Sequence, residues 1–479
     1  MNVPRAWAAL RLGAGIVVVA ASSTHAFAQV DYAADGRPWS QRADGGPDAA
    51  VDGWYYNLGI TGLRVRLIEE SPTHLVVEHV FERSPAARAV KVGDHVVGAG
   101  GRRFATPHRN GYGMSVFGAQ GPIADFAAAL ELAQTKERGG KLALTLLRAK
   151  KTIDVVLDVG TTYGAFAANY PSDCPKSERI RKELLAYLVE QQQDDGSWGS
   201  PPYDVFAALA LLGSGDAKYA AAVEKNARFH ARTTSAKDDS DLINWRYMAA
   251  AIVLSEYYLA TRDAWVLREL EQIRDFLMSS QYVDLAQLNP KVKESHPDAL
   301  PQGPLDSHGG FGHNPGFEGY GPIAMLTAQG AAAFELMKRC GIAIDAQRHE
   351  AMFAFLRRAS GANHYVWYED SPAGAQDWAD MGRTGAAAIA NFLAGATDPV
   401  HAATALEYAH IIGAHPESFP DTHGSPIMGM GFVALGAHVD PTSFRALMDA
   451  NRYWFALAQC ADGTFYYQPN RDNAGYGAD

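Results

Sequence analysis

Apolar residues recur with two different periods along the chain, and the change of period divides it into two parts. At 63–67, 74–80, 141–147 and 152–159 they alternate or cluster in short runs, which predicts strands. A helix is expected at 123–136, and a short one at 84–89, where proline follows the first residue. From about residue 176 onward the apolar positions follow a helical period.

The helical part alternates between two kinds of helix. One kind has a single apolar face, while the other is rich in Ala and Gly and apolar nearly all round, which is typical of a buried helix. The pattern therefore predicts inner helices enclosed by outer ones, an all-α α/α toroid of about six helical hairpins. The outer helices are expected at 176–193, 216–231, 262–281, 344–360, 398–412 and 441–459, and the inner ones at 203–213, 240–260, 320–339, 382–394 and 426–436.

A turn sequence recurs where outer helices end. Residues 192–198 and 459–465 both read Gln-x-x-Asp-Gly-Ser/Thr-aromatic, and 306–313 carry a related Gly-Gly-Phe turn. A turn repeated at long intervals is typical of stacked helical hairpins. In the first copy, Gly196 is expected to end the helix, Asp195 to cap the backbone and Trp198 to wedge between hairpins. We interpret Gln192 and these three residues as structural.

On these turns, the part from 176 to 479 resembles the toroids of terpenoid cyclases and protein prenyltransferases. In those families the Gln-x-x-Asp-Gly-Ser-Trp turn joins an outer helix to the next inner one. The resemblance implies a fold and not a reaction. Residues 238–241 read Asp-Asp-Ser-Asp instead of the cyclase acid motif Asp-x-Asp-Asp, and no inner helix carries the Asp-x-Cys of the zinc site of the prenyltransferases.

The part from 54 to 160 resembles a PDZ domain. The resemblance lies in Ser-Pro-Ala-Ala at 84–87, Val-Gly-Asp-His-Val-Val at 92–97 and the Gly-Gly-Arg turn at 100–102. It implies that Leu58, Gly59 and Ile60 form the loop whose amides bind a peptide carboxylate while the peptide adds to a sheet edge. An exposed edge must be either used or covered, so docking against the neighbouring helices is the alternative.

In the toroid families the ligand site is a funnel at the N-terminal ends of the inner helices, and three loops bring polar residues there. Histidine, carboxylate, guanidinium and aromatic groups together suit hydrolysis or elimination of a sugar. Arg383 starts an apolar helix, where it needs a carboxylate or an anionic ligand, whereas the histidines and Asp380 could instead cap turns. The catalytic candidates are His308, His313, Asp380, Arg383 and His423, and the ligand-binding candidates are Glu318, Tyr320, Trp378, Asp421 and Ser425.

Aromatic residues are expected to form the wall of this funnel, and a long segment lies beside it. Phe311, Tyr320, Trp367, Tyr368 and Trp378 are the wall candidates. The segment 281–303 exceeds a normal helix–helix loop and contains three prolines. It either covers the funnel or forms a surface excursion packed toward the N-terminal part.

Sequence motifs for a bound cofactor or metal are lacking. Neither Cys-x-x-Cys nor His-Glu-x-x-His occurs, so no cofactor is expected. A metal site from His308, His313 and Glu318 would match no standard spacing. The three cysteines, Cys174, Cys340 and Cys460, form no disulfide framework, and Cys340 is expected to be a buried hydrophobic residue.

The N-terminal residues predict export. Residues 1–28 combine a positive start, a short apolar run and a small-x-small site, which is typical of a signal peptide, and a linker is expected at 29–53. We therefore expect a periplasmic or secreted protein. No other stretch of the 479 residues is apolar enough to span a membrane. The net charge of −11 argues against a nucleic-acid partner.

Two functional hypotheses follow from the sequence. In the first, the toroid funnel binds a carbohydrate-like or other polar ligand and cleaves it by hydrolysis or elimination. In the second, the protein is a non-catalytic adaptor whose PDZ loop holds protein C-termini while the toroid serves as a docking platform. Isoprenoid cyclisation is disfavoured by the missing acid motif and by the predicted export.

Overall fold

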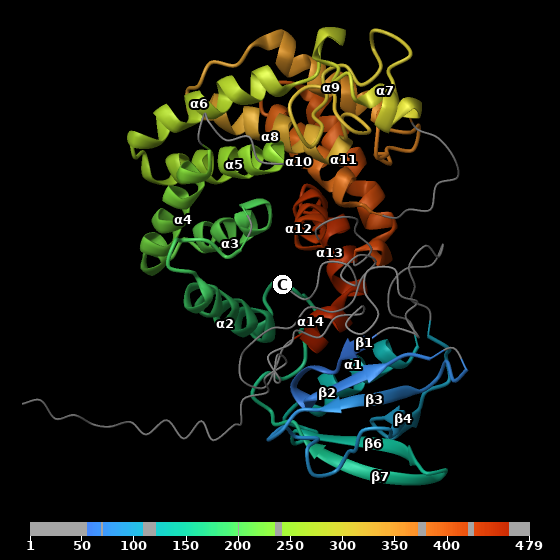
Figure 1. Cartoon of the computed structure of the whole chain (residues 1–479). Coiled ribbons are helices and arrows are strands. Elements are labelled where there is room, and N and C mark those ends of the chain that lie inside the picture. The colour runs from blue at the N-terminus through green and yellow to red at the C-terminus, as the bar shows by residue number, and fades with distance from the viewer. Residues whose placement is uncertain are drawn as a thin grey trace, which may run out of the picture.

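A sheet region is followed by a helical region (Figure 1). The computed structural model describes residues 55–68, 70–108, 121–199, 201–234, 242–371, 380–419 and 426–458. Among the predicted features, the signal peptide, the linker, the acidic run 238–241 and the second turn copy at 459–465 lie outside the described residues. Within them, no helix is both long and apolar enough to cross a membrane.

The sheet is antiparallel, and the four predicted strands are present to within one residue at each end, whereas β1, β4 and β5 were not predicted. Its order is β1-β2-β3-β4-β6-β7, with β5 paired to β4 outside this path. A 3-10 helix, η1 (Gly59–Thr61), joins β1 to β2. The strands are β1 (Tyr55–Asn57), β2 (Leu63–Arg66), β3 (Leu75–Val80), β4 (His95–Ala99), β5 (Arg102–Arg103), β6 (Lys141–Arg148) and β7 (Lys151–Asp158).

The core of the sheet region lies between the sheet and one helix, α1 (Pro122–Ala133). Leu142, Leu144 and Leu146 of β6 are buried and alternate with more exposed residues, as the two-residue period of a strand requires. Phe126 and Leu130 of α1 are fully buried against this face. The expected helix at 123–136 is therefore confirmed, although it begins and ends slightly earlier.

The short helix expected at 84–89 is not formed. This segment makes consecutive turns, and the amides of Ala89 and Val90 both donate to the carbonyl oxygen of Ala86 at 3.0 Å. The amide of Ala86 donates to the carbonyl oxygen of Thr61 at 3.1 Å. A six-residue segment gains too few helical hydrogen bonds to offset nucleation, so contacts with the neighbouring loop decide its shape.

Outer and inner helices alternate in the helical region as predicted. The last outer helix, expected at 441–459, is interrupted at Asn451 and continues as α14 (Arg452–Ala458). The outer helices are α2 (Pro175–Gln191), α4 (Ala220–Thr233), which follows η2 (Ala217–Tyr219), α6 (Trp265–Ser280), α9 (Ala346–Ala359), α11 (Pro399–Ala414), which precedes η5 (Pro416–Ser418), and α13 (Pro441–Ala450). The inner helices are α3 (Pro201–Gly213), α5 (Ile243–Thr261), α8 (Ala324–Arg339), α10 (Gly382–Ala394) and α12 (Pro426–Ala437).

Contacts between the inner helices follow a closed circuit. α3 contacts α5, α5 contacts α8, α8 contacts α10, α10 contacts α12, and α12 contacts α3 again. Each of α4, α6, α9 and α11 contacts an inner helix from outside. α10 and α12 approach closely because both carry glycine: a Cβ on Gly436 would lie 2.6 Å from the Cα of Gly385. The described part of the chain holds five outer-to-inner hairpins in this circuit.

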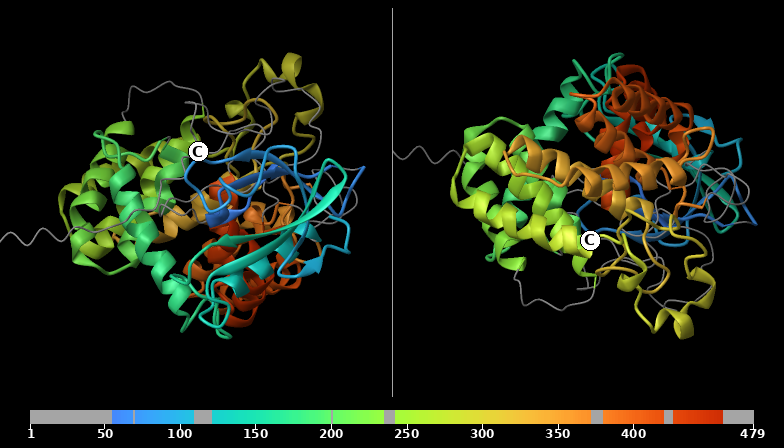
Figure 2. Two further views of the ribbon diagram at one scale, coloured as in Figure 1. Left: turned by 90° about the horizontal axis from the view of Figure 1, so that it is seen from below. Right: turned by 90° about the horizontal axis from the view of Figure 1, so that it is seen from above.

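The sheet region docks on the end of the helical region. α14 contacts α1 and η1, and one apolar core includes Tyr56 and Leu58 together with Trp454 and Leu457. Figures 1 and 2 show the sheet stacked against the C-terminal helices, with α3 to α6 to one side. The two regions therefore share a continuous core.

The segment 281–303 packs on the helical region and carries η3 (Leu285–Gln287), α7 (Val292–Ser295) and η4 (Pro297–Ala299). The amide of Phe317 donates to the carbonyl oxygen of Gln287, and that of Asn289 to the carbonyl oxygen of Phe317. Tyr282, Val292 and Phe317 form a small core of their own. The segment thus lies on the loop that carries the site candidates His308, His313, Glu318 and Tyr320, at the end of the molecule away from the sheet (Figure 1).

Candidate functional site

The Gln-x-x-Asp-Gly-Ser-Trp turn joins helices, as its sequence predicts. Gln192 ends α2, and its side-chain amide donates to the carbonyl oxygens of Gly196 (3.0 Å) and of Ala222 in the next outer helix (2.8 Å). The Trp198 indole donates to the carbonyl oxygen of Leu188 at 2.5 Å. Every one of these hydrogen bonds ends on backbone within the helical region. The turn therefore holds two outer helices together.

The Gly-Gly-Phe turn is built in the same way. Gln281 ends α6, and its side-chain amide donates to the carbonyl oxygens of Gly309 (2.8 Å) and of Arg348 in the next outer helix (2.9 Å). In three inner helices, a side chain in the first helical turn also accepts a hydrogen bond from a backbone amide of the loop before the helix. Asp204, Thr327 and Thr384 accept from the amides of Trp198 (3.3 Å), Phe311 (3.0 Å) and Val366 (3.2 Å).

These joints place three loop segments at the N-terminal ends of α5, α8 and α10. The amide of Asn244 in α5 donates to the carbonyl oxygen of His313 at 3.1 Å. The amide of Ala324 in α8 donates to the carbonyl oxygen of Tyr368 at 2.8 Å. Arg383 lies in the first turn of α10, and its Nε donates to the carbonyl oxygen of Val366 at 3.1 Å. The side chains of these segments are consequently neighbours.

Four side chains at the N-terminal ends of α5 and α8 are joined in a chain of hydrogen bonds. The indole Nε1 of Trp245 donates to Nδ1 of His313 at 2.6 Å. Nε2 of His313 bonds the hydroxyl of Tyr320, whose oxygen lies 3.0 Å from that of Tyr368. All four side chains are partly exposed. Two of them, His313 and Tyr320, are site candidates from the sequence, and Tyr368 is a predicted wall residue.

The tautomer of His313 follows from this geometry. An indole N–H donates and cannot accept, so Nδ1 of His313 must be the acceptor. Neutral His313 then carries its proton on Nε2 and donates it to the Tyr320 oxygen. Burial, together with the hydrogen bond to Tyr320, raises the pKa of Tyr368, which therefore stays protonated. Tyr368 is thus able to donate to Tyr320 as well.

Arg383 and Asp380 form a buried ion pair beside this chain. Nη1 of Arg383 donates to Asp380 at 2.7 Å, and Nη2 donates to the hydroxyl of Tyr365 at 3.1 Å. The guanidinium carbon lies 5.7 Å from the centre of the Tyr368 ring. Asp380 has the left-handed φ of 51°, and its Oδ1 is buried without a hydrogen-bond partner. The carboxylate that Arg383 requires is thus supplied by the chain itself.

His308 belongs to a different cluster. Its carbonyl oxygen accepts from Nη2 of Arg358 at 2.7 Å, and Nε of the same guanidinium donates to Asp370 at 2.9 Å. Burial, and then the charges of Arg358 and Arg348, lower the pKa of His308. Burial raises the pKa of Asp370, although its bond with Arg358 opposes this effect. These contacts place His308 beside Arg358 and Arg348, apart from the Trp245–Tyr368 chain.

The other site candidates fall outside the chain or outside the described residues. Glu318 is exposed, while Phe311 is fully buried under the turn, where it packs on Phe334 and forms no wall. No group of three His, Cys, Asp or Glu within the described residues is placed to hold a metal, so the metal alternative fails. Cys174 and Cys340 are buried free thiols, as expected for Cys340. Trp378, Asp421, His423, Ser425 and Cys460 lie outside the described residues.

Sequence reasoning missed Trp245 and Tyr365. Trp245 lies in the first turn of α5, where an exposed polar face is normal and an indole is not. Its place at the start of an inner helix, equivalent to that of Arg383 in α10, is the signal that could have identified it. Tyr365 is buried, and an aromatic residue in a Trp- and Tyr-rich loop carries no such signal.

The loop that was expected to bind a peptide carboxylate is covered. Leu58, Gly59 and Ile60 are all buried, and η1 contacts α14. Both edges of β2 are paired, one with β1 and the other with β3. A peptide cannot add to a strand whose two edges are already hydrogen-bonded. Of the two sequence alternatives, docking against the neighbouring helices is therefore the one that agrees with these contacts.

Comparisons with known proteins bear on the helical region. Residues 177–478 match the model of a family described as a domain of unknown function, DUF6288. No curated protein and no solved structure matches the chain. The matched residues extend over more than half of the sequence and include every helix of the inner circuit. The chain belongs to the DUF6288 family.

Proposed function

We propose that the helical region is an α/α toroid that binds a carbohydrate-like ligand at the N-terminal ends of its inner helices and cleaves it. The observation that carries this proposal is the chain Trp245–His313–Tyr320–Tyr368. It combines partly exposed aromatic rings with a phenol whose oxygen receives hydrogen bonds from two sides. An oxygen held in this way is suited to carry developing negative charge during a reaction.

Tyr320 is the catalytic residue of this proposal, and His313 positions it. Both ring nitrogens of His313 are engaged, so the histidine orients the phenol and does not itself contact the ligand. Tyr368 and His313 both donate to Tyr320, which leaves the hydrogen of Tyr320 to point toward the ligand. Tyr320 therefore exchanges a proton with whatever lies over the chain.

Elimination is the reaction that suits this chain better than hydrolysis. Glycoside hydrolysis commonly uses a pair of carboxylates, and Asp380 is occupied by Arg383. In an elimination, Tyr320 first gives its own proton to solvent, and His313 and Tyr368 donate to the phenolate that results. The phenolate takes the proton next to the sugar carboxyl group. A carbon–carbon double bond forms as the glycosidic carbon–oxygen bond breaks, and the phenol returns the proton to the leaving oxygen. The proposed substrate class is therefore a polysaccharide that contains uronic acids.

The experiment is a screen of uronate-containing and neutral polysaccharides for new chain ends and for the ultraviolet absorbance of unsaturated products. We expect Tyr320→Phe to lower kcat on the responding substrate by about 100-fold or more. Trp245→Phe, which removes the hydrogen bond to His313, should lower it by about 10-fold, because it loosens the position of Tyr320. Tyr257→Phe is the control, because its hydroxyl bonds Asp263 near the opposite end of α5.

Three results would count against this function. No cleavage of any polysaccharide by the wild-type protein would exclude it. Equal activity of Tyr320→Phe and Tyr257→Phe would remove Tyr320 from the mechanism. Cleavage without an unsaturated product would replace elimination by hydrolysis.

We also propose that the protein is exported and that the sheet region is a PDZ-like fold closed to C-terminal peptides. The signal-peptide pattern of residues 1–28 supports export. The paired edges of β2 and the contact between η1 and α14 support the closed fold. These contacts also disfavour the adaptor hypothesis, which needs Leu58, Gly59 and Ile60 to be accessible.

A further inference from the structure

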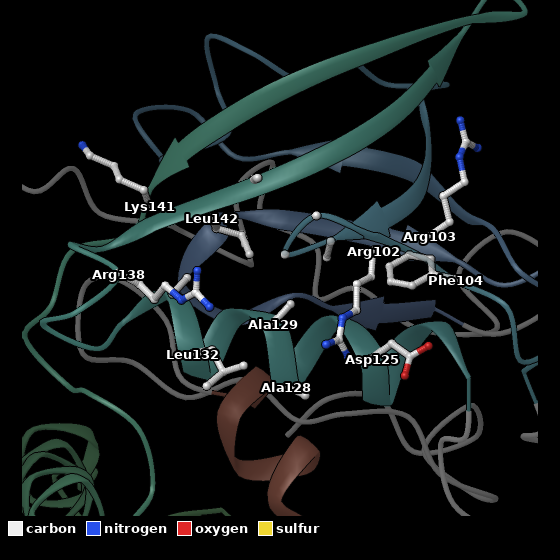
Figure 3. A pocket seen from close by; sticks show the side chains of 15 residues that line it. Arg102, Arg103, Phe104, Asp125, Ala128, Ala129, Leu132, Arg138, Lys141 and Leu142 are labelled. Atoms are coloured by element: carbon white, nitrogen blue, oxygen red, sulfur yellow. The ribbon is translucent and has the colours of Figure 1, made fainter.

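A groove lies along α1 (Figure 3). The contacts of α1 with α14 described above leave this side of the helix accessible. The groove lies between α1, the β4–β5 turn and the start of β6, and has a volume of about 430 Å³. Small aliphatic residues form its floor, among them Ala128, Ala129 and Leu142. Leu132 lines it as well and is 57% exposed, so it adds accessible apolar surface to the groove.

Four cationic residues surround this groove, and two of them are available. Lys141 is paired with Asp158 at 2.7 Å, and Arg103 donates to Thr152 at 3.4 Å. Figure 3 shows both of these side chains directed outward. Those of Arg102 and Arg138 extend toward α1 from different sides of the groove. Neither guanidinium has an ion-pair partner anywhere in the described part of the chain, although Asp125 also lines the groove.

The charge of the sheet region differs in sign from that of the whole protein. Residues 55–160 contain fourteen Lys and Arg against ten Asp and Glu, whereas the complete chain carries −11. The groove concentrates this excess, with four cationic residues and a single carboxylate among the residues that line it. A cationic site on an acidic protein attracts an anionic ligand to one place and repels it elsewhere.

We infer that this groove binds an acidic peptide segment, in which two carboxylates flank a short stretch of small apolar side chains. The carboxylates would pair with Arg102 and Arg138, and the apolar residues would cover Leu132 and the alanine floor. Guanidinium groups bind carboxylates through paired hydrogen bonds. This site is separate from the covered loop at Leu58–Ile60 and lies on a different side of α1.

The floor favours a peptide over other polyanions. Sugars and nucleic-acid bases bind on exposed aromatic faces. The aromatic residue that lines this groove, Phe104, is 8% exposed and belongs to the core. An aliphatic floor complements alanine or leucine side chains, which gain free energy when they leave water.

The test is fluorescence anisotropy with the full chain and a labelled, end-capped Asp-Leu-Ala-Leu-Asp peptide at low salt. We expect the double variant Arg102→Gln/Arg138→Gln to weaken binding by at least about 10-fold. The matched variant Arg103→Gln/Lys141→Gln removes the same charge from groups that point outward, and should change the affinity by less than about 2-fold. Ala128→Glu on the exposed face of α1 should weaken binding by about 10-fold through repulsion, while Ala128→Gln should not.

Several outcomes would overturn the inference. These are an unchanged affinity in the Arg102→Gln/Arg138→Gln variant, equal binding of an Asn-Leu-Ala-Leu-Asn peptide, and displacement of the peptide by an oligouronate at the same concentration. The last result would identify a general polyanion site. Because the peptide is measured without any substrate, this result is independent of the polysaccharide activity proposed above.

Discussion

At the scale of single residues, Lys176 places a cation where the two regions meet. It is 1% exposed, its ammonium group donates to Oε1 of Gln134, the residue that follows α1, at 3.1 Å, and it lies 4.6 Å from the centre of the Phe166 ring. Burial lowers its pKa to about 8, because desolvation disfavours the charged form. The unfolded chain has no such environment, so its lysine keeps the ordinary value of 10.5.

This difference predicts how stability depends on pH. Between pH 8 and 10.5 the unfolded chain binds more protons at this lysine than the folded chain does, so the free energy of unfolding rises with pH across this window. Below pH 8 Lys176 is protonated in both the folded and the unfolded state, so the folded state keeps the full free-energy cost of the buried charge. Relative to Lys176→Met, the wild-type protein should therefore gain about 3 kcal/mol between pH 7.5 and pH 10.5. Urea denaturation of both proteins at several pH values measures this gain.

The comparison with Lys176→Met cancels contributions from other titrating groups. Burial raises the pKa of Tyr257 and Tyr170, and these tyrosines destabilise both proteins equally as the solution becomes alkaline. A constant stability difference between the two proteins across the pH range would show that Lys176 is not desolvated in the folded state.

A single residue is predictable where one physical demand dominates. An arginine in an apolar helix needs an anion, and Asp380 supplies that anion to Arg383. The sequence could not show that this anion is internal, because the pair depends on the left-handed backbone of Asp380. Histidine carries less information, since neither local sequence predicts that His313 bonds Trp245 while His308 lies beside Arg358.

At the scale of elements, the repeated turn was predictable because its requirements are local. Gly196 and Gly309 have φ of 99° and 89°, and both face a backbone carbonyl of the next outer helix. A Cβ on Gly309 would lie 2.1 Å from the carbonyl oxygen of Ala351. We expect Gly309→Ala to lower the free energy of unfolding by about 3 kcal/mol, because the clash adds to the cost of the left-handed backbone. Thermal or urea denaturation measures this loss.

Gly215 provides the control for that substitution. Its φ is 66°, and a Cβ there would meet nothing within 4 Å. Gly215→Ala should therefore lower the free energy of unfolding by about 1 kcal/mol, because only the left-handed backbone disfavours alanine there. Equal losses at Gly215 and Gly309 would mean that the turn does not hold α9 in contact.

Elements that depend on distant partners were predicted less well. The periodicity located each inner helix because burial on all sides leaves an Ala- and Gly-rich sequence. It did not show that β1 would pair with β2, nor that the last outer helix would stop at Asn451. β1 has only three residues, too few to show a two-residue period. The break at Asn451 precedes α14, which contacts α1 and η1 of the sheet region, and one sequence contains no pattern for such contacts.

At the scale of the molecule, the shared core makes the two regions one cooperative unit. Fully buried Leu457 of α14 belongs to the same core as Leu58 and the α1 residues Phe126 and Leu130. Because α14 also contacts α13 of the helical region, a loss of packing there weakens both regions together. The wild-type protein should consequently unfold in a single thermal transition.

Leu457→Ala tests this coupling. Removing a fully buried leucine costs about 2–5 kcal/mol, and here that cost falls on the contact between the regions. We expect the single calorimetric transition to separate into two, with the sheet region unfolding at the lower temperature. Leu270→Ala in α6 is the control, since Leu270 is equally buried but lies in the core of the helical region alone. It should lower the transition temperature without dividing the transition, so two transitions in both variants would contradict a shared core.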